Sequence, residues 1–185
     1  MSRLFLTVMS LKLPIQSVNK DKSFHRKKLT EIILLTMLGV LMYVSQVIMA
    51  PLPNIELVSL FIILITRRFG YKAFLSVYVF VGCEILTYGL SMWVINYLYV
   101  WDILVIVILI IKSIDNTVIY TLISCIFGLL FGTFCSIPYF LIGGVAAGIG
   151  NIISGISYDI LHCVGNFILT LLLYRPLTKV MNKII

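Results

Sequence analysis

The sequence predicts an all-α integral membrane protein, built as a bundle of six transmembrane helices with both termini in the cytoplasm. Three observations lead to this fold class: the composition, the length of the apolar stretches and the placement of the basic residues. Of the 185 residues, 61% are hydrophobic and only 11% are charged, whereas soluble domains carry about 25% charged residues. A soluble chain of this length could not bury so much apolar surface, but a lipid bilayer can cover it.

The apolar residues form six stretches, and a transmembrane helix needs about 20 such residues in a row. The first stretch stops at Pro51 and Pro53. The second is short, so it either tilts little or is partly covered by neighbouring helices. The fifth is interrupted around Pro138. The Gly-rich segment 139–153 has three possible arrangements: it extends the fifth helix, forms a re-entrant segment or lies on the outer surface. Its small residues favour close packing between helices. The six predicted helices cover approximately 29–50, 54–66, 71–90, 92–111, 117 to the interruption, and 154–174.

The basic residues set the orientation of these helices. All 14 Lys and Arg residues fall in segments that an even number of crossings places on one side. Because Lys and Arg are enriched in cytoplasmic loops, that side is the cytoplasm and the protein is expected in the plasma membrane. Five or seven crossings would leave one basic terminus outside. The prediction is a cytoplasmic tail of residues 1–28, a membrane domain of residues 29–176 and a cytoplasmic tail of residues 177–185.

Several classes of site are not predicted. The net charge is +7, but the basic residues are spread among short loops and do not form the single basic face of a nucleic-acid-binding protein. The four cysteines, Cys83, Cys125, Cys135 and Cys163, all lie in apolar stretches without metal-ligand spacing. They are interpreted as small packing residues. We therefore expect no disulfide, no metal and no cofactor.

Four carboxylates are predicted to gather in the outer half of the bundle, contributed by four different helices. No Lys or Arg accompanies them. An ionisable group inside a membrane costs about 2.5–3.5 kcal/mol on insertion scales, so such groups are expected to serve a function. The alternative is that they are ordinary carboxylates at helix ends in contact with water. The four residues are Glu56, Glu84, Asp102 and Asp159.

Aromatic and amide side chains lie at the same level as these carboxylates. Trp and Tyr are enriched at membrane interfaces, so an aromatic belt explains some of them. A belt does not explain the accompanying amides, and aromatic rings with a few polar groups are the usual lining of a ligand pocket. We therefore predict a binding pocket to which this group adds Asn54, Tyr88, Trp93, Asn96, Tyr97, Trp101 and Asn151.

The last helix carries a polar stripe. Tyr158, His162 and Asn166 recur at i, i+4 and i+8, with Asp159 beside them, so they are expected to share one helical face. A polar stripe on an apolar helix should face the interior of the bundle, and these residues join the predicted pocket. The alternative for His162 and Asn166 is a structural hydrogen bond between helices.

Three segments resemble the substrate-binding S components of energy-coupling factor (ECF) vitamin transporters: Pro51–Leu60, Trp93–Asp102 and Ser157–Phe167. The resemblance covers about residues 28–176. It implies a subunit that captures a vitamin or vitamin precursor on the outer face and docks onto a transmembrane T subunit and two ATP-binding subunits. ATP hydrolysis would belong to those partners, in agreement with the absence of a G-x-x-x-x-G-K-[ST] loop here, so the chain is not predicted to be an enzyme.

The resemblance also implies a docking face and a substrate class. Small residues of the first helix, often A-x-x-x-A, face the T subunit in this family, and their counterparts here are Thr36 and Gly39 at a different spacing. The predicted pocket lacks the Arg or Lys that an anionic vitamin would require. A neutral or cationic heteroaromatic is therefore expected, of the hydroxymethylpyrimidine, thiamine or vitamin B6 type, with cobalamin as a larger alternative.

Two other functions stay open. One is an autonomous small carrier, in which Glu84 and Asp102 would be proton sites. The other is an intramembrane enzyme that uses His162. No H-E-x-x-H or G-x-S-x-G motif is present, and adjacent residues such as His162 and Cys163 point about 100° apart on a helix.

Overall fold

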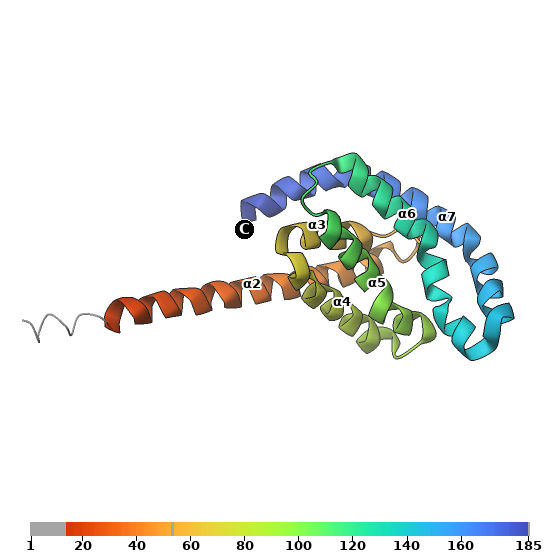
Figure 1. Ribbon diagram of the computed structural model, residues 1–185, viewed down its shortest axis with the longest axis horizontal. Coiled ribbons are helices and arrows are strands. Elements are labelled where there is room, and N and C mark those ends of the chain that lie inside the picture. The colour runs from red at the N-terminus through yellow and green to blue at the C-terminus, as the bar shows by residue number, and fades with distance from the viewer. Residues whose placement is uncertain (1–13, 53, 185) are drawn as a thin grey trace, which may run out of the picture. The chain divides into compact units, whose positions relative to one another are not determined.

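The computed structural model describes residues 14–52 and 54–184, and this part of the chain is helical without any strand. The predicted all-α class is therefore confirmed. Figure 1 shows the helices in chain order. They are α2 (Pro14–Met49), α3 (Val58–Phe69), the 3-10 helix η2 (Gly70–Lys72), α4 (Ala73–Tyr88), α5 (Met92–Ile111), α6 (Thr117–Cys135) and α7 (Ile137–Ile184).

Five helical stretches in the described part are long and apolar enough to cross a membrane. The stretch from Val58 to Tyr88 contains α3, η2 and α4 together. This finding is compatible with the predicted membrane protein, although it counts five stretches where the sequence predicts six. The other four are His25–Met49, Met92–Ile111, Thr117–Cys135 and Ile137–Lys183.

The chain divides into two compact units, residues 1–35 and residues 36–185, and the boundary between them falls within α2. In the first unit, the predicted tail is helical from Pro14 to Lys28, and its first 13 residues lie outside the described part. In the second unit α2 ends at Met49, two residues before Pro51. Proline lacks an N–H donor and disfavours helical backbone in the residue before it, so it ends the helix where the sequence predicts.

Helix α3 is short and enclosed by its neighbours. Its twelve residues extend about 18 Å, less than the roughly 30 Å of a hydrocarbon core. Eight of the twelve are buried, which favours coverage by neighbouring helices, one of the two alternatives for the short second stretch. The chain leaves α3 through Gly70, whose φ of +63° is accessible to glycine at little cost.

The hairpin of α6 and α7 depends on a second glycine. Gly144 interrupts α7 with a φ of +75°. Asn151 Nδ2 donates to Ser136 Oγ at 2.8 Å, whereas fifteen residues of straight helix would separate them by about 22 Å. The chain therefore reverses at Gly144, and residues 145–184 return beside α6 (Figure 1).

This reversal corrects the expectations for segment 139–153. The segment belongs neither wholly to the fifth predicted helix nor to a separate surface piece, because it is divided at Gly144. Its second part begins the last helix about ten residues before the predicted start at 154. The last helix also continues beyond the predicted end at Tyr174, with Pro176 inside it.

Candidate functional site

A pocket of about 330 Å³ lies where α2 and α4 end and α5 begins. This volume falls in the range of small-molecule sites, about 300–1,000 Å³. Its wall combines aromatic rings with a few polar groups, as such sites usually do. The lining residues are Gln46, Met49, Ala50, Leu52, Asn54, Ile55, Glu56, Tyr88, Trp93 and Tyr97.

The segment between α2 and α3 brings Glu56 into this pocket. Asn54 has a φ of +56° and is the only non-glycine residue with positive φ in the described part of the chain. Asparagine accepts this backbone conformation more readily than most residues. The Asn54 side chain donates to the backbone carbonyl of Tyr158 at 3.1 Å. The turn therefore fixes the segment against α7 and directs the chain toward the start of α3.

An aromatic stack leads from the pocket into the core. Trp93, Tyr97 and Trp101 are spaced four residues apart on α5, so they share one helical face. Successive ring centroids are 5.3 Å apart and the rings meet edge to face. Trp93 is 40% exposed, whereas Trp101 is fully buried. The first two rings are therefore available to a ligand, and Trp101 supports them from the core.

Glu56 and His162 connect the pocket to α7. His162 Nε2 lies 3.2 Å from Glu56 Oε1, although neither atom has an aligned hydrogen-bond partner. One turn earlier on α7, Asp159 Oδ1 accepts from the backbone N–H of Gly132 at 2.9 Å. Asp159 also interacts electrostatically with His162. Glu56 is thus shared between the pocket and the interior of the bundle.

Glu84 is the most enclosed of the carboxyls. It is fully buried, and neither of its oxygens has a hydrogen-bond partner. It interacts electrostatically with Glu56 and with Tyr97. It lies four residues after Phe80, whose ring stacks on Tyr97 with centroids 5.8 Å apart. Glu84 therefore supplies a second carboxyl behind the wall of the pocket.

The structure brings together eight of the fourteen predicted binding residues. Five of them line the pocket: Asn54, Glu56, Tyr88, Trp93 and Tyr97. The other three lie behind it, joined to Glu56 directly or through His162: Glu84, Asp159 and His162.

The remaining six have other surroundings. Asp102 accepts a hydrogen bond from Tyr78 at 2.6 Å on the α4–α5 face. Asn96 accepts one from Tyr99 at 3.1 Å.

The side chain of Tyr158 is exposed, so it does not share a face with the buried His162 and Asn166. The buried stripe of α7 is formed by Asp159, His162, Asn166 and Thr170. Trp101 lies in the core, Asn151 bonds Ser136, and Asn166 bonds other helices.

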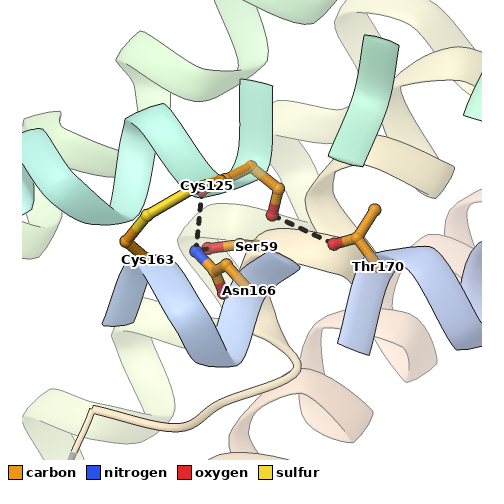
Figure 2. Close-up of a disulfide and its surroundings, with 6 residues drawn as sticks. Ser59, Cys125, Cys163, Asn166 and Thr170 are labelled. Carbon is orange, nitrogen blue, oxygen red and sulfur yellow. Dashed lines mark hydrogen bonds between the residues drawn. A yellow bond between two sulfur atoms is a disulfide. The ribbon is translucent and has the colours of Figure 1, made fainter. Parts of the chain in front are cut away.

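Asn166 is the centre of a satisfied network between three helices (Figure 2). Its Nδ2 donates to Ser59 Oγ of α3 at 3.1 Å and to the carbonyl of Ser124 of α6 at 3.0 Å. Thr170 Oγ1 bonds Ser124 Oγ at 3.1 Å. These bonds favour the structural interpretation of Asn166.

A disulfide joins Cys125 of α6 to Cys163 of α7 (Figure 2), so the expectation of no disulfide is corrected. Cys83 and Cys135 are free. The two helices approach closely because α6 carries glycine on this face. A Cβ atom at Gly128 would lie 2.9 Å from backbone atoms of His162 and Cys163.

Sequence reasoning missed two signals at this site. Gly128 and Gly132 form a G-x-x-x-G pattern, which favours close helix approach in membranes and could have indicated the α6–α7 contact. Gln46 was also missed, although it is the only amide in the first apolar stretch. Its Nε2 donates to Tyr97 Oη at 3.4 Å, and its Oε1 is buried without a partner.

The two predicted docking residues differ in their surroundings. Gly39 is buried against α4, where an added Cβ would lie 2.5 Å from the carbonyl oxygen of Ser76 and 2.8 Å from Val79 Cβ. Thr36 is half-buried. A side chain larger than glycine at position 39 would therefore first disturb the packing of α2 on α4.

Away from the pocket, a group of residues that we call the basic cluster is centred on Arg67, where α3 ends and α6 begins. Arg67 pairs with Asp115 at 3.1 Å and donates to the hydroxyl of Tyr174. Its guanidinium also lies 4.8 Å from the ring centroid of Tyr120. The end of α3, the start of α6 and the C-terminal part of α7 therefore meet around one arginine.

No protein family, curated protein or solved structure matches this chain. In the described part of the chain, no group of three or more His, Cys, Asp or Glu residues is arranged to hold a metal ion.

Proposed function

We propose that this protein is the substrate-binding subunit of an importer in the plasma membrane, similar to the S components of ECF transporters. It would capture a vitamin or vitamin precursor of neutral or cationic heteroaromatic character on the outer face. A transmembrane T subunit and two ATP-binding subunits would then supply docking and ATP hydrolysis. The observation that carries this proposal is the aromatic and acidic pocket between α2, α4 and α5.

The proposal includes six crossings, because α3 and α4 connect the same two ends of the bundle in opposite directions. Helix α3 begins after Glu56 at the pocket and ends at Arg67 in the basic cluster. Helix α4 begins after Lys72 and returns to Tyr88 at the pocket. Counting these as two crossings gives an even number, with both termini in the cytoplasm.

Charge supports the outward orientation of the pocket. No Lys or Arg occurs in residues 29–66, 73–111 or 113–174. The basic residues follow α3, α5 and the apolar part of α7, as expected for cytoplasmic segments. The pocket then opens on the outer side, where an importer first meets its substrate.

The test uses the purified chain in detergent. Small molecules would be extracted and identified by mass spectrometry, and the emptied protein titrated with water-soluble vitamins by tryptophan fluorescence. The expected result is one bound heteroaromatic molecule per chain with nanomolar affinity and no turnover. The absence of any bound molecule, together with no response to any vitamin, would reject the proposal.

The two tryptophans of the chain provide a matched control. Trp93 lines the pocket, and Trp101 is buried behind it. The Trp101→Phe variant should therefore keep most of the fluorescence change on binding, and Trp93→Phe should lose most of it. An equal loss in both variants would place the ligand elsewhere.

Reconstitution separates this function from the autonomous carrier. The isolated chain in liposomes should bind its ligand without accumulating it. Uptake driven by an ion gradient, in the absence of any ATPase, would favour the carrier.

A further inference from the structure

We infer that the pocket takes an organic cation bearing N–H donors, and that this cation replaces His162 as the charge partner of Glu56, so that binding releases a proton from His162. This inference rests on the proposed capture function and narrows its substrate class. In the exchange, the ligand ammonium or amidinium pairs with the Glu56 carboxylate, and the imidazolium of His162 gives its proton to water. The net charge around Glu56 is the same before and after binding.

The first support is the chemistry of the unpartnered atoms. Glu56 Oε1 and Gln46 Oε1 belong to residues that line the pocket, and both atoms are buried without a hydrogen-bond partner. Both oxygens of the fully buried Glu84 are also without a partner. All of these atoms are acceptors when the carboxyls are ionised. Buried polar groups are normally satisfied, so a ligand that completes this site would bring donors.

The second support is the balance of charge. Three carboxyls from separate parts of the chain, Glu56, Glu84 and Asp159, interact with one another or with His162. The remaining titratable groups that interact with this set are Tyr97 of α5 and Cys135 of α6. Among the described residues, His162 is the only basic side chain paired with these carboxyls. A cationic ligand can therefore take over the charge that His162 supplies to this set of carboxyls.

The third support is the geometry of the pair that would be exchanged. His162 Nε2 and Glu56 Oε1 lie 3.2 Å apart without an aligned hydrogen bond. His162 packs edge-on against Phe131, with ring centroids 4.9 Å apart, so it can remain in place as a neutral imidazole. Glu56 faces both His162 and the pocket, and a ligand can reach it without displacing a helix.

The aromatic wall specifies the rest of the ligand. Tyr88, Trp93 and Tyr97 form an edge-to-face series at the pocket, with successive centroids 5.3 Å apart. Such rings attract cations and stack on flat heterocycles. A volume of about 330 Å³ suits one or two small rings. The ligand class is therefore a compact aromatic amine or amidine carrying a positive charge.

The test compares ligands that differ in one group. Pyridoxamine and pyridoxine differ by a charged amine against a neutral hydroxyl. Thiamine and oxythiamine carry the same thiazolium charge and differ by an amino against an oxo group, so this pair tests the N–H donor alone. Isothermal titration of the full chain would be run with all four, in phosphate and in Tris, because these buffers differ in protonation enthalpy. We expect the amine member of a pair to bind at least about tenfold more tightly, since a hydrogen bond to a charged group contributes about 1.5–3 kcal/mol. Release of about one proton should appear as a difference in the apparent binding enthalpy between the two buffers.

Two variants distinguish the pairing of the ligand cation with Glu56 from the release of the His162 proton. Glu56→Gln should lose at least about tenfold in affinity for pyridoxamine while binding its hydroxyl counterpart pyridoxine unchanged. His162→Gln should keep binding the amine but release no proton, because it removes the group that gives the proton up. Proton release of the same size in His162→Gln would assign the proton to a carboxyl and overturn the exchange.

The outcomes distinguish this inference from the proposed function. Tight binding of pyridoxine, or of an anionic vitamin, would overturn the inference and leave the capture function standing. Binding of the amine without proton release would overturn the exchange. Failure of every vitamin to bind would reject both.

Discussion

Two buried polar regions of this protein differ in how completely their groups are paired. Around Asn166, between α3, α6 and α7, the amide nitrogen and the hydroxyls of Ser124 and Thr170 all have partners within 3.1 Å. Around Glu56, at the pocket, buried oxygens of Glu56 and Glu84 have none. Both regions lie in the same helical unit, and both would be costly to bury without partners.

This difference indicates that the polar groups around Asn166 stabilise the fold, whereas those around Glu56 serve ligand binding. A satisfied network holds helices together, because each group would lose its partner if the helices separated. An unsatisfied cluster does not hold the fold together and lowers its stability until a ligand supplies the missing partners. Variants in the first region should therefore change stability, and variants in the second should change binding.

The largest expected effect is on the close approach of α6 and α7. The Gly128→Leu variant would place side-chain atoms where backbone atoms of His162 and Cys163 lie 2.9 Å from a Cβ. The helices must then separate, and the free energy of unfolding should fall by about 3 kcal/mol. Denaturation in mixed micelles would measure it. The matched Gly82→Leu variant has no heavy atom within 4 Å of its Cβ, and equal stability of the two variants would contradict the prediction.

The Asn166→Leu variant comes next. It leaves the Ser59 hydroxyl and the Ser124 carbonyl without their partner, so the free energy of unfolding should fall by about 2 kcal/mol. The affinity for the ligand should change little, because Asn166 does not line the pocket. Tyr158→Phe on the same helix is the control, since that side chain is exposed. A large loss of binding by a folded Asn166→Leu protein would remove the distinction between the two regions.

A smaller effect is expected from the disulfide. Replacement of Cys125 and Cys163 by alanine should lower the free energy of unfolding by about 1–2 kcal/mol, because the packed helices already restrain each other. Maleimide labelling of the denatured wild-type protein should find two thiols before reduction and four afterwards. Four thiols before reduction would show that the cysteines are not bonded.

The smallest effect on stability is expected at Glu84. Glu84→Gln removes a buried, unpartnered carboxyl, so the free energy of unfolding should stay within about 0.5 kcal/mol of the wild type or increase. Binding of an amine ligand should weaken roughly tenfold, because the variant side chain can no longer ionise beside the bound cation. Thermal denaturation and titration of the same preparation measure both. A destabilised protein with unchanged affinity would reverse the roles assigned to the two regions.

The sequence was sufficient for the limits of the central helices, because these depend on local properties, but not for the start of α2 or for either end of the last helix. Apolar length fixed 92–111, and Pro51 marked the end of α2. The tertiary pairs were not predictable in the same way. Whether Cys125 meets Cys163 depends on the register of two helices, which the close approach at Gly128 and the reversal at Gly144 determine.

For the candidate site, the sequence indicated which residues share a depth in the predicted membrane, but not which side of its helix each residue lies on. Residues with the same depth, such as Glu56 and Trp93, do meet at the pocket. Tyr158 and Asp159 have almost the same depth, yet one is exposed and the other buried. Adjacent positions on a helix differ by about 100°. The buried stripe shares His162, Asn166 and Thr170 with the i, i+4 series from Tyr158 but begins at Asp159 instead.

In the membrane placement proposed above, the long arm of α7 would make the protein depend on bilayer thickness. Residues 145–184 would measure about 60 Å as a straight helix, and the part without Lys or Arg, 145–174, about 45 Å. A hydrocarbon core is about 30 Å thick, so this arm must tilt, bend or thicken the lipid around it. Because α6 is joined to the arm by the Cys125–Cys163 bond, a thinner membrane would incline both helices together.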